Sequence, residues 1–526
     1  MTRFVGSAAA QKVRAELGRS NLITAATLAV VTVLYNARYW TFPSTPGNNG
    51  QYPQGWWGWY DQGHYLASLQ AFARGDLSPA AHFYPPLYPL LAAPFSWVTS
   101  SHPFFVVDLI CLLWSAFVFQ RLAERYVPAL VASGLVIVLT VGVSSLGQAW
   151  IVPWTSSLST ALMATLVWLL MRTERERTQR ATWRAAFVFG CVGGAIILTR
   201  PLDAVVTLPL ALGFAVETVS GIGLTARLKS FVFSSTGVVS GYFVGAVAFG
   251  AFNLTVYGHI GGSYATSISN SGFLPHEALR RAVSLVFDGT TVFQEPHAAL
   301  AEHFPWLVLA GIGIGICLIR GERTLAWIGL AIGLQGCLYA PYADLLPNGM
   351  WRYGNIHYFK WMFPYLGLFA ALAVVWLIGA IRSPNGERAR RTLVGGVACL
   401  ALCLFIPHIH LDPPTSDVPP LVIITSHGTT LQLTMNGTPV DLVDFACIDG
   451  GFTDIYFGQH QLVINGQPLR PVHDFRLLPM PTGVRLLLNE RHSIRTLAFT
   501  PDPALKITQS CVRAKTDTYR LQFAFQ

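Results

Sequence analysis

Long apolar runs separated by short polar segments dominate the chain up to about residue 408. A helix needs about 20 predominantly apolar residues to cross a bilayer. Runs of this kind lie near residues 21–39, 103–121, 128–146, 152–171, 185–199, 202–217, 230–252, 304–319, 324–340, 358–380 and 392–408. The pattern therefore predicts about eleven transmembrane helices. The first run has no small-residue cleavage site after it, so we expect it to stay as an anchor. The two helices of the hairpin around Arg200 and Pro201 either cross or stop short of the far side.

After residue 411 the pattern changes to short segments in which apolar and polar residues alternate, as they do in half-buried strands. Alternating segments and turn-forming dipeptides occur at Leu421–Thr425, Leu431–Met435, Asn436–Gly437, Asn465–Gly466 and Arg485–Leu488. The sequence thus predicts a helical membrane domain over residues 1–411 and an all-β domain over residues 412–526. Cys447 and Cys511 both lie in the second part, and an oxidising compartment would favour a disulfide between them.

Composition and charge narrow the class of protein further. Hydrophobic residues make up 52% of the 526 residues and charged residues only 12%, against about 25% charged in a soluble domain. The net charge of +9 is spread in small groups between the apolar runs, without a basic stripe or an aromatic RNA-binding motif. A polytopic membrane protein is therefore expected, with membrane lipids around it and no nucleic acid partner.

The distribution of Lys and Arg predicts the orientation of the chain. With the N-terminus in the cytoplasm, most basic residues of the first 411 fall in segments on the cytoplasmic side, as the positive-inside rule requires. This orientation places the loops 40–102, 253–303 and 341–357, together with residues 412–526, outside the cytoplasm. We accordingly expect a multi-pass protein of a bacterial cytoplasmic membrane whose chemistry takes place at the outer face.

The first outer loop is rich in aromatic residues around a single acid, Asp61, within the sequence Trp-Trp-Gly-Trp-Tyr-Asp-Gln-Gly-His-Tyr at 56–65. Trp and Tyr in such a loop either form an interfacial belt at headgroup level or provide flat surfaces for a sugar ring. Asp61 begins a segment with the periodicity of a short amphipathic helix. A carboxylate among ring faces suits a general base that takes a proton from a sugar hydroxyl, although a solvated acid or a helix cap is the alternative.

Three stretches resemble motifs of the GT-C superfamily of integral-membrane glycosyltransferases, which includes protein mannosyltransferase and aminoarabinose transferase-like enzymes. They are Tyr60-Asp61-Gln62-Gly63-His64-Tyr65, Tyr84-Pro85-Pro86-Leu87-Tyr88-Pro89 and Leu198-Thr199-Arg200-Pro201. In that superfamily an Asp early in the first outer loop begins an Asp-Glu-x-x-Tyr-like motif. This chain has Gln62 where many members carry Glu, so no role of a second acid carries over. The resemblance covers the helices up to about the tenth.

The resemblance implies transfer of a sugar from a polyprenyl-phosphate donor to an extracytoplasmic glycan or lipid acceptor, with inversion at the anomeric carbon. It makes Asp61 the candidate catalytic base, and His64, Tyr65 and Tyr84 in the matching stretches candidate substrate-binding residues. A polyprenyl phosphate leaving group also needs cations nearby. Arg200 is one candidate, because an ionised side chain between two apolar runs is either functional or paired, here with Asp203.

The segment 348–361 supplies further candidates for a phosphate clamp: Arg352, His357 and Lys360. Arg352 and Lys360 are alternatively interface anchors whose charged ends reach the headgroups. Asp108, near the outer end of an apolar run, is either structural or part of an acceptor site. The loop 253–303 is long enough for a lid over a site.

The sequence assigns no metal ligand and leaves several alternative functions open. The His and acidic residues of the outer loops do not fall into a metal-binding spacing, so no metal ligand is assigned. Some GT-C relatives use a divalent cation, and the resemblance leaves that cofactor open. The alternatives to a glycosyltransferase are a ligase or polymerase of lipid-linked oligosaccharides, a transporter or flippase, and a scaffold whose working part is the β domain.

Overall fold

The computed structural model describes most of residues 2–382 and, beyond them, mainly strands between residues 422 and 525. Within 2–382 the stretches left undescribed are 51–52, 176–182, 219–223, 263–274, 276–277, 290–298, 343–344 and 346–348. For residues 2–17, 19, 175, 224–227, 352–353 and all the strands, the backbone alone is described.

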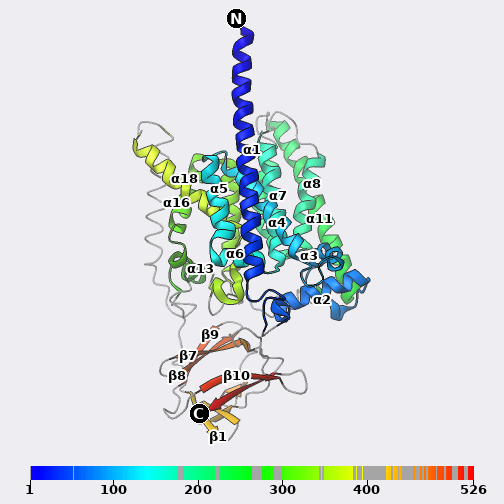
Figure 1. Ribbon diagram of the computed structural model, residues 1–526, viewed down its shortest axis with the longest axis vertical. Coiled ribbons are helices and arrows are strands. Elements are labelled where there is room, and N and C mark those ends of the chain that lie inside the picture. The colour runs from blue at the N-terminus through cyan, green and yellow to red at the C-terminus, as the bar shows by residue number, and fades with distance from the viewer. Residues whose placement is uncertain are drawn as a thin grey trace.

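Helices build nearly all of the described part of residues 2–382 (Figure 1). The main ones, in chain order, are α1 (Thr2–Thr41), α2 (Tyr60–Arg74), α3 (Leu87–Ala92), α4 (Phe105–Ala123), α5 (Ala129–Ile137), α6 (Ser144–Ile151), α7 (Thr155–Arg175), α8 (Trp183–Ile197), α9 (Pro201–Val206), α10 (Leu208–Glu217), α11 (Leu224–Tyr257), α13 (Ala278–Val286), α15 (Leu300–His303), α16 (Leu307–Arg320), α17 (Arg323–Tyr339) and α18 (Met362–Arg382). Short 3₁₀ segments are η1 (Gly55–Gly58), η2 (Pro79–Ala81), η3 (Ala93–Trp97) and η8 (Gly349–Tyr358), and η4 (Val138–Gly142) is a π-helix.

Several of these helices are long and apolar enough to cross a membrane. Four pass by length and composition: Ser20–Thr41 within α1, Phe105–Ala123, Leu228–Tyr257 within α11, and Met362–Arg382. The pair formed by Ala129–Gly142 and Ser144–Ile151 passes together but bends by 69°. All the apolar runs predicted up to residue 380 coincide with helices, whereas the run 392–408 lies outside the described residues. The number and the direction of crossings stay predictions.

Polar contacts gather the ends of several helices at one end of the bundle. Glu174 near the end of α7 accepts hydrogen bonds from Arg125 (3.3 Å) and from Thr324 at the start of α17 (2.6 Å). The neighbouring Arg323 pairs at 3.1 Å with Glu217, the last residue of α10. The segment that follows Arg200 therefore reaches the same end as α7, despite a break at Thr207 between α9 and α10.

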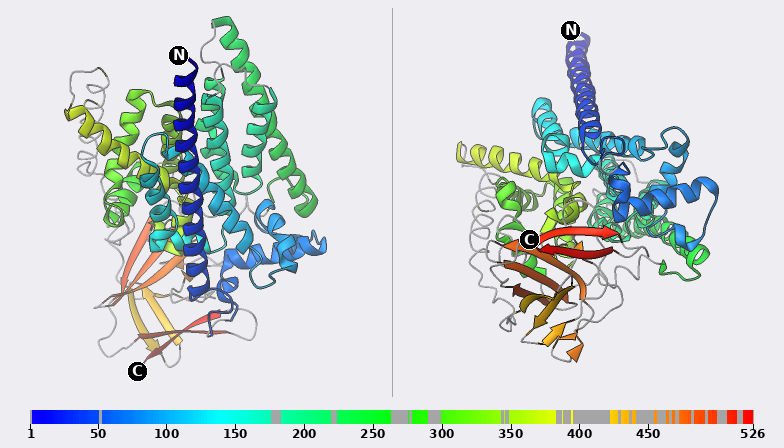
Figure 2. Two further views of the ribbon diagram at one scale, coloured as in Figure 1. Left: turned by 45° about the horizontal axis from the view of Figure 1, so that its top comes forward. Right: turned by 60° about the horizontal axis from the view of Figure 1, so that its bottom comes forward.

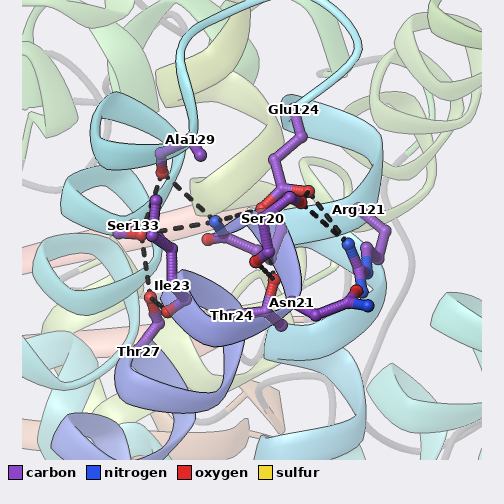
Figure 3. Close-up of polar contacts among 10 residues, drawn as sticks. Ser20, Asn21, Ile23, Thr24, Thr27, Arg121, Glu124, Ala129 and Ser133 are labelled. Carbon is purple, nitrogen blue, oxygen red and sulfur yellow. Dashed lines mark hydrogen bonds and ion pairs between the residues drawn. The ribbon is translucent and has the colours of Figure 1, made fainter. Parts of the chain in front are cut away.

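A second polar cluster joins α1 to α4 and α5 (Figure 3). The Glu124 carboxylate accepts hydrogen bonds from Ser20, Gln120 and Arg121 at 2.7, 2.8 and 3.2 Å. Further along α1, the Thr27 hydroxyl donates to the Ser133 hydroxyl of α5 at 2.8 Å. Because such bonds replace unsatisfied polar groups between apolar helices, they fix how α1 sits on the bundle.

The loop 40–102 contains ordered helices. The short helix predicted after Asp61 is α2, which ends at Gly75 in the left-handed conformation with φ of 69°. In both Figure 1 and Figure 2 this blue segment lies crosswise to α1. Helical segments also interrupt the two later loops: α13 and α15 lie within 253–303, and η8 spans most of 341–357. The lid expected for 253–303 stays a prediction, because much of that loop is outside the described residues.

Beyond residue 421 the structure describes strands and their pairing. They are β1 (Val422–His427), β2 (Thr430–Met435), β3 (Thr438–Val440), β4 (Asp454–Ile455), β5 (Val463–Ile464), β6 (Gln467–Pro468), β7 (Val472–Met480), β8 (Gly483–Glu490), β9 (Ser493–Phe499), β10 (Ile507–Arg513) and β11 (Tyr519–Phe525). The sheet orders are β3-β2-β1-β9-β8-β7-β4, β10-β11 and β5-β6. An independent all-β domain with its own core stays a prediction, because the connecting segments and the side chains are not described. The same holds for the expected disulfide between Cys447 and Cys511.

Candidate active site

Asp61 lies in the first turn of α2 and is held by a tyrosine from the next segment of the loop. The Tyr84 hydroxyl donates a hydrogen bond to Asp61 Oδ1 at 2.5 Å. The adjacent Gln62 is buried, and its Nε2 donates to the Pro153 carbonyl at 2.9 Å, between α6 and α7. The start of α2 is therefore tied to the helical bundle, and the rotamer of the Asp61 carboxylate is set by Tyr84.

The aromatic residues around Asp61 divide into a packed layer and an accessible edge. Tyr65 is only 2% exposed and packs against Tyr84 with ring centroids 4.9 Å apart, so its ring holds the Tyr84 ring in place. Tyr60 is 52% exposed, and His64 stacks on Phe83 at 4.7 Å. Any direct contact of a sugar with Tyr65 would need movement of this layer, whereas Tyr60 is open to a ligand.

Burial and charge determine the protonation of this group of side chains. Burial and the neighbouring Asp61 carboxylate raise the pKa of Tyr84 well above its usual value, so the phenol stays protonated and can donate to Asp61. Burial also lowers the pKa of the His64 imidazole, which favours its neutral form. The carboxylate thus stands beside neutral hydrogen-bonding groups.

Arg200 caps the start of α9 within a buried polar network. Its Nε lies 3.1 Å from Asp203 Oδ2, and its Nη2 donates to the Tyr339 hydroxyl at 3.0 Å. The guanidinium also lies 4.4 Å from the ring centroid of Tyr358. Asp203 accepts two further hydrogen bonds, from Tyr339 and from Ser159, both at 2.6 Å. The Arg200 to Asp203 pair weighed from the sequence is therefore present.

Lys360 is buried, at 1% exposure, instead of reaching the headgroups. Its Nζ donates to the Ala149 carbonyl at 2.9 Å and to the Ser157 hydroxyl at 2.7 Å, and it lies 4.5 Å from the ring centroid of Trp150. An ammonium has three N–H donors, and these three partners match them. A direct bond from Lys360 to a phosphate would need one partner to be given up.

His357 carries an unused hydrogen-bonding atom inside the protein. Its ring stacks on Trp154 with centroids 3.7 Å apart and an interplanar angle of 8°, and its Nδ1 is 3.0 Å from the Ser156 hydroxyl. Nε2 is buried and has no hydrogen-bond partner among the described residues. Burial, reinforced by Arg200 and Lys360, lowers the pKa of His357 well below its usual value. A neutral imidazole can offer Nε2 to a ligand as either donor or acceptor.

The first turns of α7 organise this whole group, which the sequence reading did not foresee. Each hydroxyl of the sequence Thr155-Ser156-Ser157-Leu158-Ser159 contacts a different partner: Thr155 contacts Arg200 at 3.5 Å, Ser156 contacts His357, Ser157 contacts Lys360, and Ser159 contacts Asp203. The available signal was a run of hydroxyl residues at the start of an apolar run, a pattern that usually indicates only helix capping.

One backbone contact joins the segment that follows Tyr84 to the segment that precedes Arg200. The backbone N–H of Leu87 donates to the Leu198 carbonyl at 3.0 Å, which joins the second and third of the GT-C-like stretches. The side chain of Arg352 lies outside the described residues, so its place in the predicted clamp stays a prediction.

Within the described part of the chain, no group of three or more His, Cys, Asp or Glu side chains is arranged to hold a metal ion. No protein family, curated protein or solved structure matches the chain.

Proposed function

We propose that this protein is an integral-membrane glycosyltransferase. It moves a sugar from a polyprenyl-phosphate donor to a glycan or lipid acceptor outside the cytoplasm. The observation that carries the proposal is the Asp61 carboxylate, fixed by Tyr84, in a loop that Leu87 joins to the segment just before the buried Arg200. Sugar transfer from a phosphate needs both a base for the acceptor and positive charge for the leaving group.

The reaction follows from the two groups as a single in-line displacement. The acceptor oxygen attacks the anomeric carbon while its proton passes to Asp61. The bond between the anomeric carbon and the phosphate oxygen breaks, and both of its electrons leave with the polyprenyl phosphate. Arg200 and Nε2 of His357 stabilise the added negative charge on that phosphate. Attack opposite the leaving group inverts the anomeric configuration.

The membrane supplies the setting for this chemistry. In the proposed orientation the start of α1 faces the cytoplasm, and α2, Asp61 and the first turns of α7 face the outside. The polyprenyl chain of the donor lies in the bilayer beside the apolar helices, which keeps its phosphate at the depth of the buried cations.

The decisive experiment compares wild type with Asp61→Asn in lipid nanodiscs. Donors are polyprenyl phosphates of mannose, glucose, galactose, an amino sugar and arabinofuranose, offered with cell-envelope glycan and lipid extracts. Release of polyprenyl phosphate is followed by mass spectrometry. Because general-base catalysis contributes about 10²- to 10⁴-fold, Asp61→Asn should lose at least about 100-fold. Asp76→Asn, an acid of the same loop whose Oδ1 accepts from the Ser78 backbone N–H, is the matched control.

The outcomes separate the alternatives. Equal turnover by wild type and Asp61→Asn would remove Asp61 as the base. If no phosphate-linked donor is consumed while pyrophosphate-linked oligosaccharides are, the protein is a ligase or polymerase instead. Movement of a donor between leaflets without release of polyprenyl phosphate would identify a flippase and refute the transferase.

A further inference from the structure

The loop 40–102 ends in a long segment without charged side chains. Between Asp76 and Asp108 the sequence has no Asp, Glu, Lys or Arg residue. A segment of this length in water usually carries charges, because about a quarter of the residues of a soluble domain are charged. Its later part holds α3 and η3 and leads directly into α4. The proposed reaction uses no side chain of α3 or η3, so their composition needs another explanation.

Large apolar side chains of α3 and η3 are open at the surface. Trp97, the last residue of η3, is 80% exposed, and the adjacent Val98 is 78% exposed. Leu90 and Leu91 in α3 are 47% and 44% exposed, whereas Tyr88 of the same helix is buried. These four exposed residues form the apolar patch of the loop. An exposed group of this kind indicates a surface that contacts a partner or a membrane.

Two candidate membrane spans meet next to the apolar patch, because the span in α1 ends there and the span in α4 begins there. The ring centroid of Tyr39 in α1 lies 4.7 Å from that of Phe105, the first residue of α4. The ring of the neighbouring Trp40 lies 5.7 Å from the same Phe105 ring. Trp and Tyr at the end of an apolar span are typical of the boundary between acyl chains and headgroups. The two helix ends therefore mark one such boundary.

A short turn holds Val98 close to this boundary. A backbone hydrogen bond of 2.9 Å from the N–H of His102 closes the turn just after Val98. The His102 ring lies 4.7 Å from the ring of Trp40, and its Nδ1 is 3.0 Å from the Tyr39 hydroxyl. Val98 precedes His102 by four residues, which span at most about 14 Å even when fully extended. In Figure 1, α3 likewise lies level with the last turns of α1.

We propose that the apolar patch is a membrane-binding surface, seated between headgroups and acyl chains in the leaflet where α1 ends and α4 begins. Lipid is the partner because the patch lies beside the ends of two apolar spans and belongs to a segment without charged side chains. Trp97 suits this depth, since its indole combines a large apolar ring with one polar N–H. Tyr84 lies three residues before α3, so the same contact holds the loop of Asp61 at the lipid surface.

Fluorescence quenching in nanodiscs tests the lipid contact. In variants free of other reactive cysteines, Trp97→Cys and Val98→Cys each carry an environment-sensitive fluorophore. Ser78→Cys is the matched control, because Ser78 is exposed in the same uncharged segment and its N–H bonds the Asp76 carboxylate. One quencher is a nitroxide on the lipid just below the headgroup, and the other is iodide in the water.

The fluorophore at position 97 or 98 should emit at shorter wavelength than the one at 78. It should be quenched by the lipid nitroxide and protected from iodide, whereas the fluorophore at 78 should be quenched by iodide. Quenching by iodide alone at all three positions would overturn the proposal. Protection from both quenchers at 97 and 98 would also overturn it, because protein, either residues 412–526 or a second copy of the chain, would then cover the patch.

A second substitution shows whether the side chains of the protein or the fluorophore itself seek the lipid. With the fluorophore kept at Val98→Cys, adding Trp97→Asp should reduce the quenching by the lipid nitroxide, because a carboxylate is costly to hold at that depth. Adding Ser78→Asp instead should leave the quenching unchanged. Equal quenching in all three proteins would refute a contribution of Trp97 to membrane binding. None of these results depends on turnover of a sugar donor, so the proposal and the proposed function can fail separately.

Discussion

Asp203→Ala is expected to destabilise the protein strongly, because it leaves the Arg200 guanidinium buried without its carboxylate. The side chains of the pair are 9% and 4% exposed, with Arg200 Nε 3.1 Å from Asp203 Oδ2. Removing one member of a buried pair typically costs about 3–5 kcal/mol. The hydroxyls of Ser159 and Tyr339 lose an acceptor as well, so the upper part of that range applies. The melting temperature should fall by an amount on the order of 10 °C.

The assay is thermal or denaturant unfolding in nanodiscs, with a longer and more accessible ion pair as the control. Arg320 and Glu322 lie 3.9 Å apart with side chains 15% and 32% exposed, and Glu322→Gln should cost less than about 1 kcal/mol. If Asp203→Ala also costs less than about 1 kcal/mol, then the buried guanidinium finds other compensation and the reasoning is wrong.

A double variant separates the structural role of this pair from its proposed role in donor binding. Arg200→Met with Asp203→Leu removes both charges, and replacing a buried pair by apolar residues is often close to neutral. Its stability should return to within about 2 kcal/mol of wild type. Its turnover should stay lost, because no guanidinium remains for the leaving phosphate. Recovery of both stability and turnover would leave the pair as purely structural.

Two further predictions concern the outer loop and the orientation of the chain. Gln62→Glu should lower the free energy of unfolding by about 1–3 kcal/mol at neutral pH, because an ionised carboxylate cannot donate to the Pro153 carbonyl. This loss of stability should shrink as the pH falls and the carboxyl group is protonated. The control is Gln54→Glu at an exposed position, which should have no effect on stability at any pH. In a variant free of other reactive cysteines, Ser78→Cys should react with an impermeant maleimide in intact cells, and Gly18→Cys only after lysis; the reverse pattern would invert the proposed orientation.

The apolar periodicity predicted the helices well because burial in lipid or in the bundle requires the same long runs. The sequence also predicted the helix after Asp61, and it offered the pairing of Arg200 with Asp203 as an alternative to a phosphate-binding role for Arg200; both depend on residues close in sequence. The hydrogen-bond partners of Lys360 could not be predicted from the sequence. Its partners come from α6 and from α7, about 200 residues earlier in the chain, and α6 follows a bend of 69° after η4.

Two hydrogen bonds anchor residues 60–87 to the segments that carry the candidate cations. Gln62 bonds the carbonyl of Pro153 just before the hydroxyls of α7, and Leu87 bonds the carbonyl of Leu198 just before Arg200. Pro153 therefore lies within a few residues of the α7 hydroxyls that contact the basic residues, and Leu198 lies two residues before Arg200. Since catalytic groups need positions fixed to a fraction of an ångström, the same contacts that stabilise the loop also set the distance from Asp61 to those cations. A loop variant such as Gln62→Glu should accordingly lose turnover at a pH where most of the protein is still folded.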